Sequence, residues 1–191
     1  MAGFDIDLSQ MIADELGVTL TILDMPFDTL ISACNSSIND MIVAAMTYTE
    51  SRAEILSPSI NYISLSQVVI IRKNSTDFPT TIESLNNLTG FNVGVQSGTV
   101  MHDKLLNIPG VIVTVYFNAI SLIQDLVNGV IQAAYIEEPI FTVWMQKENL
   151  RIIFGTDSWP LAIWCKYGEP ELLSIINKVI FESYQNVKML N

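Results

Sequence analysis

Apolar residues along this chain follow two spacings in turn, one typical of helices and the other of strands. Between Leu8 and Leu16 they recur every three or four positions, and Gly17 is placed to end the resulting helix. The same spacing returns between Leu172 and Ile180, near the end of the chain. Short runs rich in β-branched and apolar residues predict buried strands in between. The predicted strands lie at residues 18–23, 41–44, 67–71, 91–95, 111–116, 133–136, 152–154 and 161–165.

Helix-capping residues support this order of elements. Asp28 and Asn118 each precede a short helical pattern as candidate N-caps, and Thr80 precedes Glu83 at the spacing of a capping box. Gly129 is placed to end the helix that Asn118 begins. Strands and helices that alternate in this way predict an α/β fold with mostly parallel sheets. In such sheets ligands bind at the carboxyl ends of the strands, which directs the search for a site.

Composition excludes several classes of function. Half of the 191 residues are apolar, yet no stretch approaches the roughly 20 apolar residues of a membrane span. The net charge of −11 argues against nucleic acid as a partner, because phosphate binding needs clustered basic residues. The two cysteines, Cys34 and Cys165, lie too far apart for a metal motif, and we expect them to be small core residues. We therefore expect no metal and no cofactor.

The strongest candidate chemistry follows the predicted strand at 41–44. Arg52 comes shortly after the hydroxyl of Thr47, in a chain with 9 basic and 20 acidic residues. A guanidinium group holds a carboxylate through two parallel N–H···O bonds, and the unpaired N–H groups at a helix start add donors. This set predicts a receptor for a small carboxylate. The alternative is an ordinary strand-to-helix turn, with Thr49 as N-cap and Arg52 solvated.

Two further polar segments come directly after predicted strands. The turn at 97–99 follows the strand at 91–95, and Glu137 follows the strand at 133–136. Strand ends are where an α/β sheet places its ligand contacts.

Five segments carry a resemblance to a known family. They match, in order and over nearly the whole chain, the motifs of the solute-binding proteins of polar amino-acid ABC transporters, which form family 3 of the extracellular solute-binding proteins. The segments are Gly3-Phe4-Asp5-Ile6-Asp7-Leu8, Phe27-Asp28-Thr29-Leu30-Ile31, Met46 to Arg52, Val93 to Thr99, and Asn128 to Ala134.

The resemblance implies a fold and a division into domains. The implied fold is α/β and periplasmic-binding-protein-like (type II), a "Venus flytrap" of two lobes, each a mostly parallel sheet flanked by helices. Residues 1–65 and 162–191 would form lobe 1, which we expect to be incomplete, and residues 66–161 would form lobe 2. Relative to the family, the N-terminal strand and the C-terminal helix are expected to be lacking.

The resemblance also implies a ligand and a set of contacts. A small free amino acid would bind between the lobes for delivery to an ABC transporter permease, in a periplasmic or extracellular, membrane-anchored protein; we expect no signal peptide in the chain as given. Arg52 and Thr47 would hold the α-carboxylate, and Glu137 would accept the α-amine in place of the family's usual aspartate. Phe27 would pack against the ligand side chain. The implied ligand-binding residues are Phe27, Ala45, Thr47, Arg52, Ser97, Thr99 and Glu137.

Two alternatives use the same fold. A truncated relative could have lost its ligand and persist as an interaction or structural module. The unpaired sheet edges of such a chain favour a homodimer or a domain-swapped dimer. A dehydratase-type enzyme is the other alternative, in which Glu137 beside Glu138 supplies a general acid or base. No nucleophile with a base, metal set or cofactor loop accompanies these glutamates, so we expect a binding protein rather than an enzyme.

Overall fold

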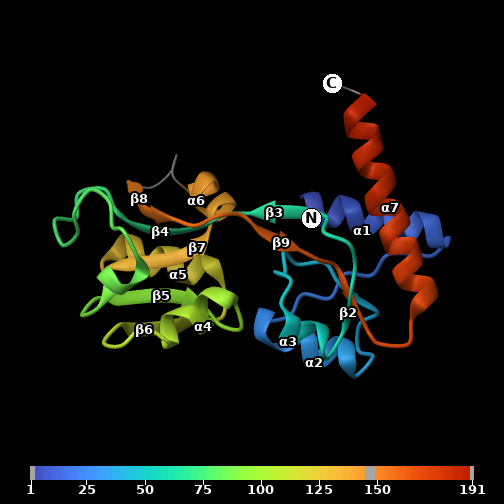
Figure 1. The fold of residues 1–191 in the computed structure, drawn as a ribbon, viewed down its shortest axis with the longest axis horizontal. Helices are drawn as coiled ribbons and strands as arrows, with labels where there is room; N and C mark the ends of the chain where they lie inside the picture. The colour runs from blue at the N-terminus through green and yellow to red at the C-terminus, as the bar shows by residue number, and fades with distance from the viewer. Residues whose placement is uncertain (1–2, 145–148, 190–191) are drawn as a thin grey trace. The chain divides into compact units, whose positions relative to one another are not determined.

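The computed structural model describes residues 3–144 and 149–189, in a chain that divides into two compact units (Figure 1). Unit 1 contains Met1–Met25, Thr29–Ser64 and Pro160–Asn191, and unit 2 contains Pro26–Asp28 and Leu65–Trp159. The chain leaves unit 1 along β3 (Ile63–Leu65) and returns along β9 (Trp159–Leu161), and these two strands pair with each other.

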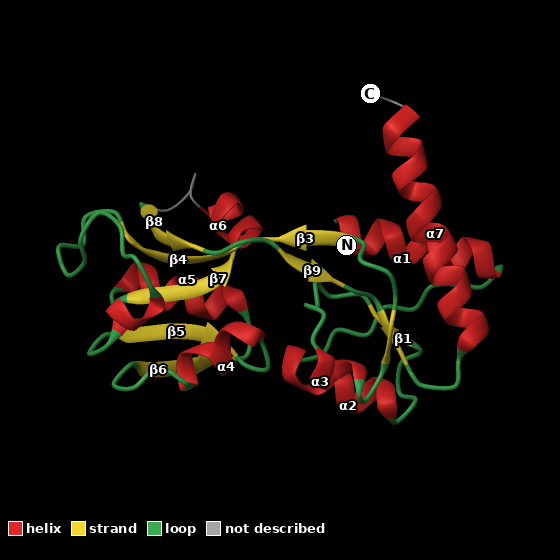
Figure 2. Cartoon of the chain, in the orientation of Figure 1, coloured by secondary structure: helices red, strands yellow, loops and turns green. Residues whose placement is uncertain are grey.

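Unit 1 is built from helices around a small sheet (Figure 2). The long helix α1 buries Leu8 and Ile12 and packs on the C-terminal helix α7, which buries Ile176. Trp164 is fully buried in the sheet. The helices are α1 (Phe4–Leu16), α2 (Leu30–Asn35), α3 (Glu50–Ala53) and α7 (Pro170–Met189). The strands β1 (Met41–Ile42), β10 (Trp164–Cys165) and β2 (Ser57–Pro58) form an antiparallel sheet in that order.

Unit 2 is a five-stranded sheet with helices on both faces. β4 is buried along almost its whole length because its alternate residues face two separate cores. Val69 and Ile71 face a core that includes α4, while Val68 and Ile70 face a core that includes α5. In order across the sheet the strands are β6 (Ile112–Tyr116), β5 (Asn92–Gln96), β7 (Ala133–Glu137), β4 (Gln67–Arg72) and β8 (Leu150–Gly155). The helices are η2 (Leu85–Leu88), α4 (Val100–Leu106), α5 (Ala119–Asn128) and α6 (Glu138–Trp144).

Several predicted helix ends are confirmed at the atomic level. Gly17 ends α1 in the left-handed conformation, with φ 68°. The Asn118 side chain caps α5 by accepting the N–H of Ser121, and Gly129 ends this helix at φ 81°. These ends depend on local backbone conformation and local hydrogen bonds, which is why the sequence alone identifies them.

Residues 18–23 are the clearest error in the predicted elements. They form no strand, and most of their side chains are exposed. A strand needs a hydrogen-bonded neighbour, and no strand of the described chain pairs with this segment. Alternating apolar residues are therefore not enough to predict a strand here, because the strand that would pair with it must come from elsewhere in the fold.

The sheets are also less parallel than predicted. β5 runs parallel to β6 and β7, but β4 runs antiparallel to both β7 and β8. The three-stranded sheet of unit 1 is antiparallel throughout. β4 and β8 continue from the two strands that join the units, so their direction follows from the path of the chain rather than from a local strand–helix repeat.

Two predicted caps are wrong. Thr80 and Glu83 do not begin a helix; the capping box that forms is between Ser84 and Asn87, at the start of η2. Asp28 does not cap α2, because it lies inside the 3-10 turn η1 (Phe27–Thr29) that precedes this helix; its carboxylate accepts a hydrogen bond from the Ser97 hydroxyl.

Candidate functional site

In unit 1 the candidate residues lie on one short path that leads from β1 to α3. After β1 ends at Ile42 the chain turns through Ala45, whose φ of 48° lies in the left-handed region. It continues through Thr47 to Thr49, which is the N-cap of α3. The Thr49 hydroxyl accepts the backbone N–H of Arg52 at 3.2 Å, as the N-cap prediction requires.

The alternative in which Arg52 is solvated is wrong. Only 7% of Arg52 and 4% of Thr47 is exposed. The Arg52 Nη1 donates a 2.7 Å hydrogen bond to the backbone carbonyl of Thr47, so the side chain folds back along its own loop. A buried guanidinium group is costly unless it is hydrogen-bonded or paired, and the bond to Thr47 contributes to this requirement.

The residues on either side of Thr47 are held by hydrogen bonds to the β9–β10 region. The carbonyl of Met46 accepts the backbone N–H of Ala162 at 3.1 Å and the indole N–H of Trp164 at 3.3 Å. The N–H of Tyr48 donates to the carbonyl of Pro160 at 2.8 Å, and its ring stacks on Trp164. Thr47 is therefore held in a segment with little freedom to move.

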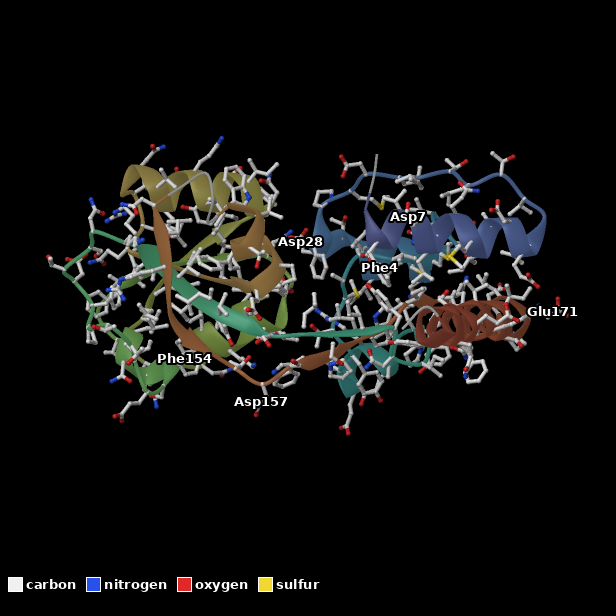
Figure 3. The ribbon with its side chains drawn as sticks, turned by 90° about the horizontal axis from the view of Figure 1, so that it is seen from above. Phe4, Asp7, Asp28, Phe154, Asp157 and Glu171 are labelled. Carbon is white, nitrogen blue, oxygen red and sulfur yellow. The ribbon has the colours of Figure 1, made fainter. Side chains whose placement is uncertain are left out.

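In unit 2 the turn after β5 carries the second group of candidates. The Ser97 hydroxyl donates a 2.8 Å hydrogen bond to the carboxylate of Asp28, which is labelled in Figure 3. Thr99 is buried as the N-cap of α4; its hydroxyl accepts the N–H of His102 and donates to the carbonyl of Gln96. Phe27 directly precedes Asp28, so this contact brings the Phe27 segment to the Ser97–Thr99 turn.

Glu137 is the last residue of β7, and it lies at the carboxyl ends of the parallel strands, where the Ser97–Thr99 turn also lies. The register of the parallel pair β5–β7 sets Val95 opposite Tyr135, so both strands end together. Glu137 lies opposite Gln67 on β4 and is half-buried. The seven candidates thus fall into two sets: Ala45, Thr47 and Arg52 lie in unit 1, whereas Phe27, Ser97, Thr99 and Glu137 lie in unit 2.

A buried polar cluster beside Glu137 escaped the sequence analysis. Gln67, only 1% exposed, accepts two hydrogen bonds at its side-chain oxygen, from the Lys104 ammonium and from the Tyr135 hydroxyl, both at 2.9 Å. The Lys104 ammonium also lies 4.0 Å from the centre of the Trp159 ring. Burial, and next the charge of Glu137, raise the pKa of Tyr135. The sequence held one signal of this cluster, which is the polar residue Gln67 at the start of the otherwise apolar strand 67–71.

This cluster gives the stability a dependence on pH that Lys104→Met should remove. Burial lowers the pKa of Lys104 from its ordinary 10.5, so the unfolded chain holds this proton more tightly than the folded chain. Between the lowered folded pKa and 10.5, the free energy of unfolding contributed by Lys104 rises with pH. We expect the stability of the native chain, relative to Lys104→Met, to increase from neutral to alkaline pH.

Urea unfolding at several pH values measures this difference. Lys73→Met, at an exposed lysine, is the control for loss of a surface charge. A stability difference between the native chain and Lys104→Met that stays constant or shrinks with rising pH would contradict the prediction.

Two other kinds of site are absent from the described residues. Between 3–144 and 149–189, no helix combines the length and apolar character needed to cross a membrane. In the same part of the chain, no group of three or more His, Cys, Asp or Glu side chains is arranged to hold a metal ion.

The chain matches one protein family along nearly its whole length. The model of the bacterial extracellular solute-binding proteins, family 3, matches residues 1–190. Among curated proteins, the putative ABC transporter arginine-binding protein 2 of Escherichia coli (strain K12) is 26% identical over 94% of this chain and 75% of its own length. The arginine-binding extracellular protein ArtP of Bacillus subtilis (strain 168) is 32% identical, over 54% of this chain and only 39% of its own length.

Solved structures show the same likeness in three dimensions. The truncated, arginine-bound form of ArgBP from T. maritima superimposes with a TM-score of 0.89 and 32% sequence identity. The match covers 95% of this chain and 85% of that one. The α/β, two-unit architecture is therefore that of type II periplasmic amino-acid-binding proteins.

Proposed function

We propose, given that this chain belongs to family 3 of the bacterial extracellular solute-binding proteins, that it binds one free amino acid and delivers it to an ABC transporter permease. One observation carries the proposal. In a chain with few basic residues, Arg52 is buried beside Thr47 in a loop that is fixed on both sides. A fixed guanidinium group with an adjacent hydroxyl matches the planar α-carboxylate that all amino acids share.

Each candidate residue takes one part of the ligand in this proposal. Arg52 and Thr47 hold the α-carboxylate from unit 1, with Ser97 and Thr99 as further donors from unit 2. Glu137 accepts the α-ammonium group. Its half-buried carboxylate lies at the carboxyl end of β7, beside the end of β5 from which the Ser97 turn begins.

The ligand side chain is the part that the candidate residues define least. Phe27 and Ala45 would meet it with apolar surface, which by itself argues against a cationic side chain. The named relatives nevertheless bind arginine, and that makes L-arginine the first amino acid to test.

Thermal unfolding in the presence of each standard amino acid, one at a time, tests the proposal. A ligand that binds only the folded state stabilises it by about 2.7 kcal/mol at 100 times its dissociation constant, so the melting midpoint must rise. We expect clear shifts with one or a few related amino acids, L-arginine first. A protein that melts cooperatively and responds to none of them would instead favour the interaction-module alternative.

Location and assembly follow from the same proposal. The family is extracellular or periplasmic, and we propose the same location for this chain. The named relatives are binding proteins, and we propose binding without catalysis. A homodimer or domain-swapped dimer remains a prediction.

A further inference from the structure

We infer that Asp5 is a positioning residue for amino-acid binding: from helix α1 it holds Ala45 in a left-handed backbone conformation and thereby sets the course of the loop that carries Thr47. The inference rests on the proposed function and adds to it a residue outside the predicted ligand contacts. Asp5, Ala45 and Tyr62 all belong to unit 1.

Three hydrogen-bonding groups meet at this point. One carboxylate oxygen of Asp5 accepts the backbone N–H of Ala45 at 2.9 Å, and the other accepts the Tyr62 hydroxyl at 3.1 Å. The Ala45 N–H also donates a 3.1 Å hydrogen bond to the Tyr62 hydroxyl oxygen, so Asp5 and Tyr62 share this donor. Tyr62 is 3% exposed, and burial raises the pKa of Asp5 despite these two donors. The Asp5 side chain therefore makes contacts inside the unit rather than on its surface.

Ala45 needs such a restraint because of its backbone. At φ 48° the Cβ of an L-residue crowds the following carbonyl oxygen, so this conformation is strained for alanine. Glycine would adopt this conformation without that strain. An alanine that relaxed to negative φ would change the direction in which the chain enters Met46 and Thr47. The hydrogen bond from the Ala45 N–H to Asp5 opposes this relaxation.

The support behind Asp5 is rigid. Helix α1 is anchored by the buried side chains of Leu8 and Ile12. Phe4 stacks on the Tyr62 ring, with centroids 6.1 Å apart, and the Tyr184 hydroxyl donates to the Tyr62 carbonyl at 2.6 Å. Figure 3 labels Phe4 on this helix, together with Asp7. Through its hydrogen bond to Ala45, Asp5 thus fixes the start of the loop relative to helix α1.

The anchors at Met46 and Tyr48 stay in place when the Asp5 contact is weakened, so the change should be confined to the chain around Ala45 and should not unfold the unit. Asp5→Asn keeps the shape of the side chain but replaces one acceptor oxygen by an NH₂ donor, so it cannot accept both bonds. Asp7→Asn is the matched control, because Asp7 lies on the same helix and is exposed.

The decisive experiment is a double-mutant cycle with Ala45→Gly. Calorimetric titration with L-arginine, or with the amino acid that gives the largest thermal shift, measures affinity in four proteins: native, Asp5→Asn, Ala45→Gly and the double variant. We expect Asp5→Asn to weaken binding about tenfold in the native background, but only about two- to threefold in the glycine background. The two losses differ by a factor of about three to five, which corresponds to about 0.7–1 kcal/mol of coupling between Asp5 and the conformation of Ala45. An equal loss in both backgrounds, or no loss in either, would overturn the inference.

A second readout keeps the inference separate from the proposed function. Hydrogen exchange of the Ala45 amide, followed by NMR, should be faster in Asp5→Asn than in the native protein and unchanged in Asp7→Asn. If no amino acid binds the native protein, the proposed function fails, and equal Ala45 exchange in all three proteins would overturn the positioning role as well. Tyr62→Phe removes one donor to Asp5 and also the second acceptor of the Ala45 N–H. It replaces Asp5→Asn if that variant does not fold, and unchanged affinity and exchange in Tyr62→Phe would also count against the role.

Discussion

Arg52→Ala is expected to abolish measurable amino-acid binding. Removing one partner of a buried, hydrogen-bonded charge pair costs about 2–5 kcal/mol, which corresponds to a loss of roughly 30-fold to several thousandfold in affinity. Arg52→Lys should recover little of this loss, because an ammonium group cannot form two parallel bonds to a carboxylate. Calorimetric titration with the amino acid that shifts the melting point measures both variants.

Arg72→Lys is the matched control for this prediction. Arg72 is half-buried, whereas Arg52 is buried, and like Arg52 it donates to backbone carbonyls, those of Leu126 and Ile131. It lies at the opposite end of β4 from Gln67. Its replacement should lower the free energy of unfolding and leave the affinity unchanged. Native-like affinity in Arg52→Ala, or an equal loss in Arg72→Lys, would remove the basis for the carboxylate site.

The second large effect is expected at Gly98, in the turn that carries Ser97 and Thr99. Gly98 has φ +73°, and a Cβ at this position would lie 2.8 Å from the Cα of Asp28. Gly98→Ala would therefore strain the turn twice, through its conformation and through a clash with backbone that cannot move aside cheaply. We expect a loss of about 2–4 kcal/mol in the free energy of unfolding, and a marked loss of ligand affinity. Urea unfolding and calorimetry measure the two effects.

Gly90→Ala separates the two sources of strain. Gly90 has a similar φ of +86°, but a Cβ there would meet nothing within 4 Å. It should therefore show only the conformational cost, about 1 kcal/mol, with no effect on binding. If Gly98→Ala cost no more than Gly90→Ala, the close approach of Asp28 would have no energetic importance.

Part of the candidate site was visible in the sequence because its chemistry is local. Thr49 and Arg52 stand three residues apart, and that spacing alone predicts the N-cap hydrogen bond that the structure contains. Ser97 and Glu137 follow strands that the apolar pattern identifies, so the sequence alone places them at strand ends. The family motifs rest on the same short segments.

Other parts of the site depend on residues that are distant in the sequence. The burial of Arg52 requires the packing of the whole unit, and the spacing of its neighbours is equally compatible with a solvated side chain. Asp5 and Ala45 are 40 positions apart, and Asp28 and Ser97 are 69 apart. No periodicity connects residues at such distances.

The sequence by itself determined the order of the elements, the ends of α1 and α5, the buried strand β4 and the identity of the arginine that we propose as the anion anchor. These features follow from hydrogen bonds and side-chain spacing within a few residues. Only the tertiary structure decided that residues 18–23 form no strand, that β4 runs antiparallel to β7, and that Asp28 binds Ser97 instead of capping a helix. In each of these cases the outcome depends on which partner the folded chain brings near, and a partner's position is a property of the packing rather than of the local sequence.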